Sequence, residues 1–303
     1  MLRTNEHALV IKAVMGHISP PKMVLKNPYI VSSSGKPVVL PGTGGITYNV
    51  LVGDSAFSFE GDHIEPCVSI SADDKSPDST IQGALSILSC IGNEAYVVSG
   101  HASGSKGIVT GKHGGVEHIL CDFPRSTLQK LSIGDRIQIR AKGQGLELKD
   151  FPDVAVMNVA PELFKRLGIK RNRGKLIVPV THVIPASIMG SGYGSRHSFS
   201  GDIDIQMPDK EAVKKHGLQE LRIGDIVAIR DLDSRYGRVV RDKAISIGVV
   251  VHASCLVSGH GPGVTMIMSA DSERIVPRID EGANIGVIMG IGRFRKGGSY
   301  GRR

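Results

Sequence analysis

The 303-residue chain contains no tryptophan, few aromatic residues of any kind (4%) and no long apolar run. Proteins that bind single-stranded nucleic acids stack bases on aromatic side chains, so this scarcity argues against such a function. The longest apolar stretch, around Ala84–Ile91, is far shorter than the roughly 20 residues that span a bilayer. Glu6 and His7 precede only a short apolar stretch, which is not a signal-peptide pattern. These absences predict a soluble, cytoplasmic protein with no membrane partner.

Disulfide and familiar catalytic motifs are missing as well. The four cysteines (Cys67, Cys90, Cys121 and Cys255) are scattered without C-x-x-C spacing, as expected of reduced thiols. The sequence has no G-x-S-x-G, P-loop or H-E-x-x-H motif. The loop GSGYGS (190–195) is followed by a turn-and-strand pattern instead of a helix, which excludes a dinucleotide-binding fold there.

Positive charge is concentrated at the C-terminus. The formal net charge is +8, and Arg293, Arg295, Lys296, Arg302 and Arg303 supply five positive charges. A basic segment on a nearly neutral body predicts a flexible, peripheral tail over 293–303. Such a tail attracts phosphates weakly and non-specifically, so specific nucleic-acid binding is not expected as the main function.

Two thirteen-residue segments echo each other ninety residues apart. LQKLSIGDRIQIR (128–140) and LQELRIGDIVAIR (218–230) agree at eight positions. Each predicts a short helix, a tight turn at Gly-Asp and a strand with alternating buried isoleucines. A proline-led helix is also expected over Pro161–Ile169. The repeated order of signals favours a duplication that yields two related lobes.

Short β-branched runs cut by glycine and proline fill most of the remaining chain. They favour a β-rich α+β fold, a barrel or sandwich with short helical crossovers. The polar stretch 170–174 separates the echoes, so we expect an N-terminal lobe over 1–169, a C-terminal lobe over 170–292 and the basic tail over 293–303.

Several longer segments resemble one known family. They are GDHIEPCVSI (61–70), GKHGGVEHIL (111–120), the two LQ-x-L-x-IGD segments and VSGHGPGVT (257–265). Together they are similar to a bacterial and archaeal family described as a domain of unknown function. The resemblance implies an N-terminal barrel of the RIFT, or cradle-loop, type and a distinct C-terminal domain. It covers most of the chain, excludes the basic tail and implies no particular activity.

The segment Asp62-His63-Ile64-Glu65 is the first candidate site. On an extended backbone His63 and Glu65 share one face, and Asp62 faces the other side unless a turn brings it round. A histidine and a carboxylate on one face can bind a divalent metal, or act as a base and its orienting group. The alternative is a strand end with solvated polar groups.

Histidines beside glycines form the second candidate. His101, His113 and His260 each have a glycine neighbour, and the sequence VSGH occurs at both 98–101 and 257–260. We therefore expect metal ligands at His63, Glu65, His101 and His260, with His63, Glu65 and His101 catalytic. Such nitrogen and oxygen donors suit Zn²⁺, Mn²⁺ or Fe²⁺. The alternative is that these imidazoles only satisfy backbone groups at turns.

The loop GKHGG (111–115) is a candidate anion cradle, with Lys112, His113 and Gly114 as substrate-binding residues. The alternative is a structural hairpin. Three functional hypotheses remain open: a metal-assisted hydrolase or lyase acting on a small polar, anionic metabolite between the lobes; a non-catalytic ligand- or RNA-binding barrel; and a structural homo-oligomer.

Overall fold

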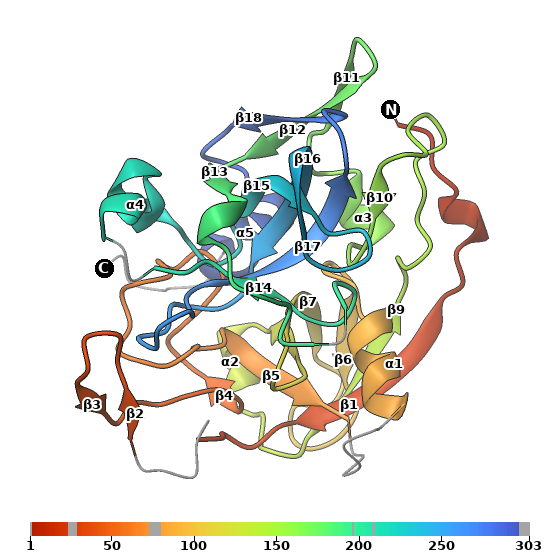
Figure 1. Ribbon diagram of the computed structural model, residues 1–303. Coiled ribbons are helices and arrows are strands. Elements are labelled where there is room, and N and C mark those ends of the chain that lie inside the picture. Colours follow the sequence, from red (N-terminus) through yellow and green to blue (C-terminus); the bar gives the residue numbers. More distant parts are fainter. Residues whose placement is uncertain (1, 24–28, 73–79, 196, 208–209, 297–303) are drawn as a thin grey trace.

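Two sheets, one of them closed on itself, form the body of the protein in the computed structural model, which describes residues 2–23, 29–72, 80–195, 197–207 and 210–296. In Figure 1 the barrel strands lie in the lower half and the second sheet in the upper half. Among the described residues, no helix combines the length and hydrophobicity needed to cross a membrane.

Six strands of the described chain close into a barrel. In sheet order they are β1 (Lys12–Ile18), β9 (Arg136–Ala141), β6 (Glu94–Val97), β7 (Lys106–His113), β8 (His118–Asp122) and β5 (Cys67–Ser71), with β4 (Ile46–Thr47) added beside β5. β1 closes the barrel because it pairs with β9 and, through His17 and Ile18, also with β5. Closure leaves no open sheet edge among these six strands. The predicted β-barrel is confirmed.

The second sheet is open and lies above the barrel in the view of Figure 1. Its strands are β10 (Ala155–Val156), β17 (Gly263–Ala270), β16 (Val239–Val250), β15 (Ile226–Asp233) and β13 (His182–Pro185), with β14 (Ile203–Asp204) also paired to β17. A smaller sheet contains β11 (Lys170–Asn172), β12 (Lys175–Val180) and β18 (Ile275–Ile279), and β2 (Ile30–Val31) pairs with β3 (Pro37–Val38).

The helices are short, as the crossover pattern predicts. The α-helices are α1 (Thr80–Leu88), α2 (Arg125–Leu128), α3 (Pro161–Phe164), α4 (Lys210–Lys215) and α5 (Ile285–Met289). The 3-10 turns are η1 (Glu6–Ala8), η2 (Ala186–Ile188), η3 (Leu218–Glu220) and η4 (Gly292–Phe294). Since α1, the longest helix in the described part of the chain, has nine residues, packing and not intrinsic helicity must stabilise these helices.

The two echo segments have the same local geometry. Each runs from a helical turn through a glycine at positive φ (Gly134 at 89°, Gly224 at 91°) into a strand, β9 or β15. In each turn an aspartate accepts a hydrogen bond at 2.8 Å from the backbone N–H three residues earlier, Asp135 from Ser132 and Asp225 from Arg222. Their surroundings differ, because β9 is antiparallel to both neighbours whereas β15 runs parallel to β13.

The barrel and the second sheet share buried residues at their junction. Val50, Val52 and Leu120 from the barrel side pack in one apolar cluster with Val249 and Ile267 of the second sheet. Strand β7 meets β17 directly, because the Thr265 hydroxyl donates to the Lys112 carbonyl oxygen at 3.0 Å. β10 lies before the expected boundary at 169/170, yet it pairs with β17 of the second sheet. One continuous hydrophobic core therefore runs through the junction.

The start of the basic tail is not free, contrary to the sequence expectation. Arg293 forms an ion pair with Asp54 (2.6 Å), and Arg295 forms one with the buried Asp122. Burial raises the pKa of Asp122 to about 6, although Arg295 acts in the opposite direction. The local reason is that η4 packs into the turn at Gly53, where Phe294 lies. Residues 297–303 lie outside the described part of the chain.

Candidate metal centre

Six ionisable side chains from separate stretches of the chain meet where the barrel joins the second sheet. His63 precedes β5, His113 ends β7, Asp202 and Asp204 lie at β14, and His252 and His260 lie between β16 and β17. We call these six residues the histidine–aspartate cluster. Two triplets within it, His63–Asp204–His260 and His113–Asp202–His252, each have their donor atoms within 4.8 Å of one another.

His63 sits on a turn and not on the extended segment that the sequence predicts. Its φ is +52°, in the left-handed region that side chains with a Cβ rarely adopt. The turn brings Asp62 round, so the Nδ1–H of His63 donates to Asp62 Oδ1 at 2.8 Å. Nε2 of His63 is thereby left to face the cluster, an orientation that a carboxylate commonly fixes for metal-binding histidines.

Nε2 of His63, Nδ1 of His260 and Oδ2 of Asp204 form a small triangle of donor atoms. The separations are 3.1 Å between the two nitrogens, 3.5 Å from His63 to Asp204 and 2.9 Å from His260 to Asp204. Ligands at about 2.1 Å from one tetrahedral ion lie about 3.4 Å apart, so the triangle has the size of a metal site.

The pKa values of His63 and Asp204 are shifted by their contacts in this triangle. Burial lowers the pKa of His63, but hydrogen bonds that its ring donates to Asp204 and Asp62 outweigh burial and raise that pKa to about 12. Burial alone would raise the pKa of Asp204, yet its histidine neighbours bring it well below the usual range. The site therefore favours a positive charge between these groups, whether protons or a cation supply it.

The second triplet is more deeply buried. Nδ1 of His252 donates to the carbonyl oxygen of Ala253 at 2.8 Å, so Nε2 carries either the lone pair of the neutral ring or the second proton of the imidazolium. That Nε2 lies 2.9 Å from Asp202 Oδ2, and neither atom has a further hydrogen-bond partner among the described residues. His252 is 0% exposed and Asp202 4%. Two lone-pair atoms in contact need a proton or a metal between them.

The contact between His252 and Asp202 requires glycine at position 263. A Cβ on Gly263 would lie 1.8 Å from Asp202 Oδ2 and 2.2 Å from His252 Nε2. The other Asp202 oxygen is fixed, because Gly114 N–H donates to Oδ1 at 2.7 Å. Nearness to Asp202 and Asp204 outweighs burial and raises the pKa of His252 to about 10.

His113 completes the triplet, and Glu65 orients it. Oε1 of Glu65 accepts from Nδ1 of His113 at 2.7 Å and from Nδ1 of His118 at 2.9 Å. Oε2 accepts from Gly44 N–H and from the Ser69 hydroxyl, both at 2.6 Å. Although burial raises the pKa of Glu65, the two histidines bring it well below its usual range. Both oxygens are occupied, so Glu65 orients His113 and His118 and has no oxygen directed into the cluster.

Five of the six cluster residues, all but His252, line a cleft of about 550 Å³. Much of the remaining lining is glycine, from the β7–β8 turn (Gly114, Gly115), the 190–194 loop and Gly259. A Cβ on Gly114 would lie 2.0 Å from the Tyr193 carbonyl oxygen, so the two loops need glycine to meet. His260, whose side chain is 49% exposed, lies on the open side.

Two residues expected at the site lie elsewhere. His101 is exposed in the turn before β7, at the opposite end of this eight-residue strand from His113. Strands rise about 3.3 Å per residue, which separates the two ends of β7 by roughly 23 Å. Lys112 is fully buried, and its ammonium donates to Asn158 Oδ1 (2.8 Å) and to the Phe199 and Ile87 carbonyls. It braces the junction, because its side chain points to the other face of β7 from His113.

The sequence reasoning missed Asp202, Asp204 and His252. The signal was present in GDIDIQ, where two aspartates at i and i+2 share one strand face. His252 and Cys255 stand three residues apart in the sequence, but the two side chains do not form a nucleophile pair. The Cys255 thiol instead donates to Asp62 Oδ1 at 2.8 Å, and burial raises its pKa.

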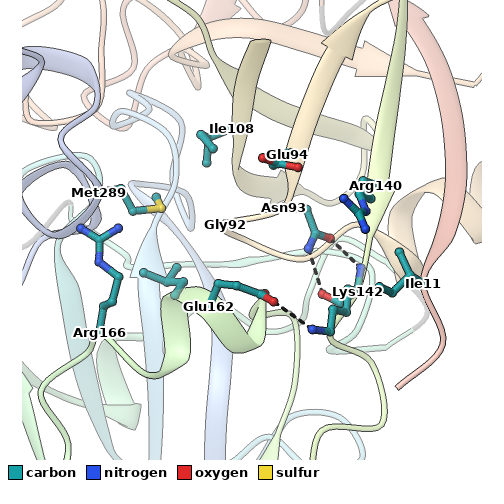
Figure 2. A pocket seen from close by; sticks show the side chains of 11 residues that line it. Ile11, Gly92, Asn93, Glu94, Ile108, Arg140, Lys142, Glu162, Arg166 and Met289 are labelled. Carbon is teal, nitrogen blue, oxygen red and sulfur yellow. Dashed lines mark hydrogen bonds and ion pairs between the residues drawn. The ribbon is translucent and has the colours of Figure 1, made fainter. Parts of the chain in front are cut away.

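A second hollow, of about 420 Å³, lies between the barrel and helices α3 and α5. Figure 2 shows the Glu162 side chain pointing toward that of Lys142. Lys142 pairs with Glu162 at 2.9 Å, and Arg166 donates to the Ile288 carbonyl oxygen. We call it the lateral hollow. Its Lys142–Glu162 ion pair joins side chains of opposite fixed charge at the surface, whereas the cluster gathers buried histidines and aspartates.

Two consecutive family models cover most of the chain. "Domain of unknown function (DUF4438), N-terminal" matches residues 29–165, and its C-terminal counterpart matches residues 166–289. The chain belongs to this two-domain family. A solved structure described as "Crystal structure of TM1086" is 50% identical, with a TM-score of 0.89, over 94% of this chain and 98% of that one. No curated protein matches the chain significantly. The resemblance inferred from the sequence is thus confirmed.

Proposed function

We propose that the protein is a divalent-metal-dependent hydrolase that acts on a small, polar, anionic metabolite in the cleft at the histidine–aspartate cluster. The observation that carries the proposal is the convergence of buried donor atoms at the cluster, above all His252 Nε2 and Asp202 Oδ2, which lie 2.9 Å apart and have no further hydrogen-bond partner among the described residues. A proton or a metal ion must lie between two such atoms.

The donor set supports a metal with an open coordination position. Imidazole nitrogens and carboxylate oxygens suit Zn²⁺, Mn²⁺ or Fe²⁺. His63, His260 and Asp204 supply three donors, and three protein ligands with a free position are typical of catalytic sites. A metal in such a site lowers the pKa of a bound water and polarises a carbonyl or phosphoryl oxygen.

Charge and shape favour a small anionic substrate. Two neutral imidazoles and one carboxylate leave a divalent ion with a net charge of +1 (2 − 1), which attracts an anionic oxygen. Glycine-rich walls let backbone N–H groups approach such a group closely. Lys112, expected to bind the anion, is engaged at the junction, so the metal and the backbone take its place.

The test uses protein purified without a metal-affinity step. Elemental analysis should find Zn, Mn or Fe. A panel of phosphate monoesters, carboxylate esters, lactones and amides should reveal a hydrolytic activity that a chelator abolishes and the ion restores. His63→Ala should lose both metal and activity. His101→Ala, which removes an exposed histidine far from the cluster, should keep both.

Two results would count against the proposal. If His63→Ala bound as much metal as the wild-type protein, the cluster would not be the metal site. If the protein held metal in the cluster but hydrolysed nothing in the panel, a non-catalytic ligand-binding role would replace the hydrolase. Circular dichroism of each variant would separate misfolding from loss of a ligand.

A further inference from the structure

We infer that the cluster holds two divalent ions bridged by Asp204. This inference rests on the proposed function and specifies the kind of centre. The first ion would be bound by His63, His260 and Asp204 Oδ2, and the second by His113, His252, Asp202 and Asp204 Oδ1.

Asp204 occupies the bridging position because its two oxygens face different histidines. Oδ2 lies 2.9 Å from His260 Nδ1 and 3.5 Å from His63 Nε2, whereas Oδ1 lies 3.6 Å from His252 Nε2. β14 directs Asp204 and Asp202 to the same side, two residues apart. A carboxylate bridges two metal ions when each of its oxygens lies beside the histidines of a different ion. Such paired ions lie about 3.5–4 Å apart.

The imidazole rings keep the two sites adjacent but distinct. Ring centroids are 4.9 Å apart for His63–His260 and 4.2 Å apart for His113–His252. His63 and His252, one from each site, are 5.3 Å apart. Each site thus has its own histidine pair, and a single ion at about 2 Å from each nitrogen could not serve both pairs and both aspartates.

The charge count also matches two ions. Asp62, Glu65, Asp202 and Asp204 place four carboxylates within the buried region, and their partners among the described residues are histidines, Cys255, Ser69 and backbone N–H groups. Two divalent cations supply 2 × 2 = 4 positive charges against these four negative ones. One ion would leave two of these carboxylates to be compensated by protonated histidines and hydrogen bonds alone.

The sites should differ in exchange rate. His260 is half-exposed, whereas His113, His252 and Asp202 are buried. The ion at His63 and His260 therefore faces the cleft and keeps the open position for water and substrate. The ion at His113 and His252 is enclosed and should leave more slowly.

The experiment is a Mn²⁺ titration of the chelator-stripped full chain, followed by calorimetry and electron paramagnetic resonance. The wild-type protein should bind two Mn²⁺ per chain and give the multiline spectrum of a coupled pair. His260→Ala and Asp202→Asn should each bind one ion and show the spectrum of isolated Mn²⁺. Asp204→Asn should abolish the coupling, and His101→Ala should behave as wild type.

Failures of the inference and of the proposed function are distinguishable. One Mn²⁺ per chain in the wild type, lost in both His260→Ala and Asp202→Asn, would overturn the paired centre while leaving a metal-dependent function intact. No Mn²⁺ bound at the cluster would overturn both. Thermal melting of each stripped variant would show that the compared proteins are folded.

Discussion

The histidine–aspartate cleft and the lateral hollow have similar volumes, about 550 and 420 Å³, but their charged groups are arranged differently. In the lateral hollow, Lys142 and Glu162 neutralise each other, and Glu162 is 63% exposed (Figure 2). In the cleft, imidazole nitrogens and carboxylate oxygens, all atoms that can bind a metal, face one another. A hollow alone therefore does not identify a site. A buried convergence of imidazole nitrogens and carboxylate oxygens, the donors that transition metals prefer, does.

Removal of a buried metal ligand should give the largest difference in metal affinity between the cleft and the lateral hollow. His252→Ala is expected to weaken Mn²⁺ or Zn²⁺ binding by at least about 100-fold, because it removes a direct ligand, whereas partners of ligands alone contribute 10–100-fold. Lys142→Ala in the lateral hollow should leave the affinity unchanged. Competition with a fluorescent chelator measures both, and equal losses in the two variants would refute the distinction.

Glu65→Gln should have the next largest effect. The amide keeps the size of the side chain but removes the negative charge that orients His113 and His118, so metal affinity should fall by about 10–100-fold. The same competition assay applies. Unchanged affinity would mean that Glu65 has only a structural role.

Metal affinity should also rise with pH, by up to about tenfold per pH unit for each proton that an ion displaces. In the metal-free protein the pKa of His63 is about 12 and that of His252 about 10, so protons occupy the donor atoms at neutral pH. Isothermal titration in buffers of different ionisation enthalpy would count the protons released. A pH-independent affinity would contradict the account.

The stability of the metal-free protein should fall as the pH rises, whereas its metal affinity rises. Both pKa values lie above the unfolded value of about 6.5, so protonation stabilises the fold fully below pH 6.5. This contribution is lost as the pH rises through about 10 for His252 and about 12 for His63. The melting temperature of stripped protein should therefore fall between pH 7 and 10, and bound metal should suppress the fall.

The smallest effect is expected from Glu162→Gln. This change breaks the Lys142 ion pair in the lateral hollow, but the carboxylate is largely exposed. Exposed pairs contribute about 0–1 kcal/mol, so urea unfolding should shift by no more than that and metal binding should not change. A larger shift would show that the lateral hollow is more than a solvated groove.

Sequence patterns predicted the fold better than the site. The isoleucines of LQKLSIGDRIQIR alternate with polar residues along β9, and Ile137 and Ile139 are buried as expected. Barrel closure could not be predicted, because it depends on β1 pairing with β5 as well as β9. Such long-range pairing leaves no local trace in the chain.

The site was predicted in part. Glycine neighbours pointed to His113 and His260, but the same pattern also pointed to His101, which lies at the other end of β7. Glu65 was expected as a ligand because an extended segment was assumed, whereas the backbone turns at His63. Asp202, Asp204 and His252 meet the others only through the β14–β17 pairing, which no short motif encodes.

Anomalous diffraction at the manganese edge, from crystals of stripped protein soaked in Mn²⁺, tests the central claim most directly. The account predicts two peaks about 3.5–4 Å apart, on either side of Asp204 and within about 2.2 Å of the histidine nitrogens. Peaks confined to the lateral hollow or to surface carboxylates, with none at the cluster, would contradict it.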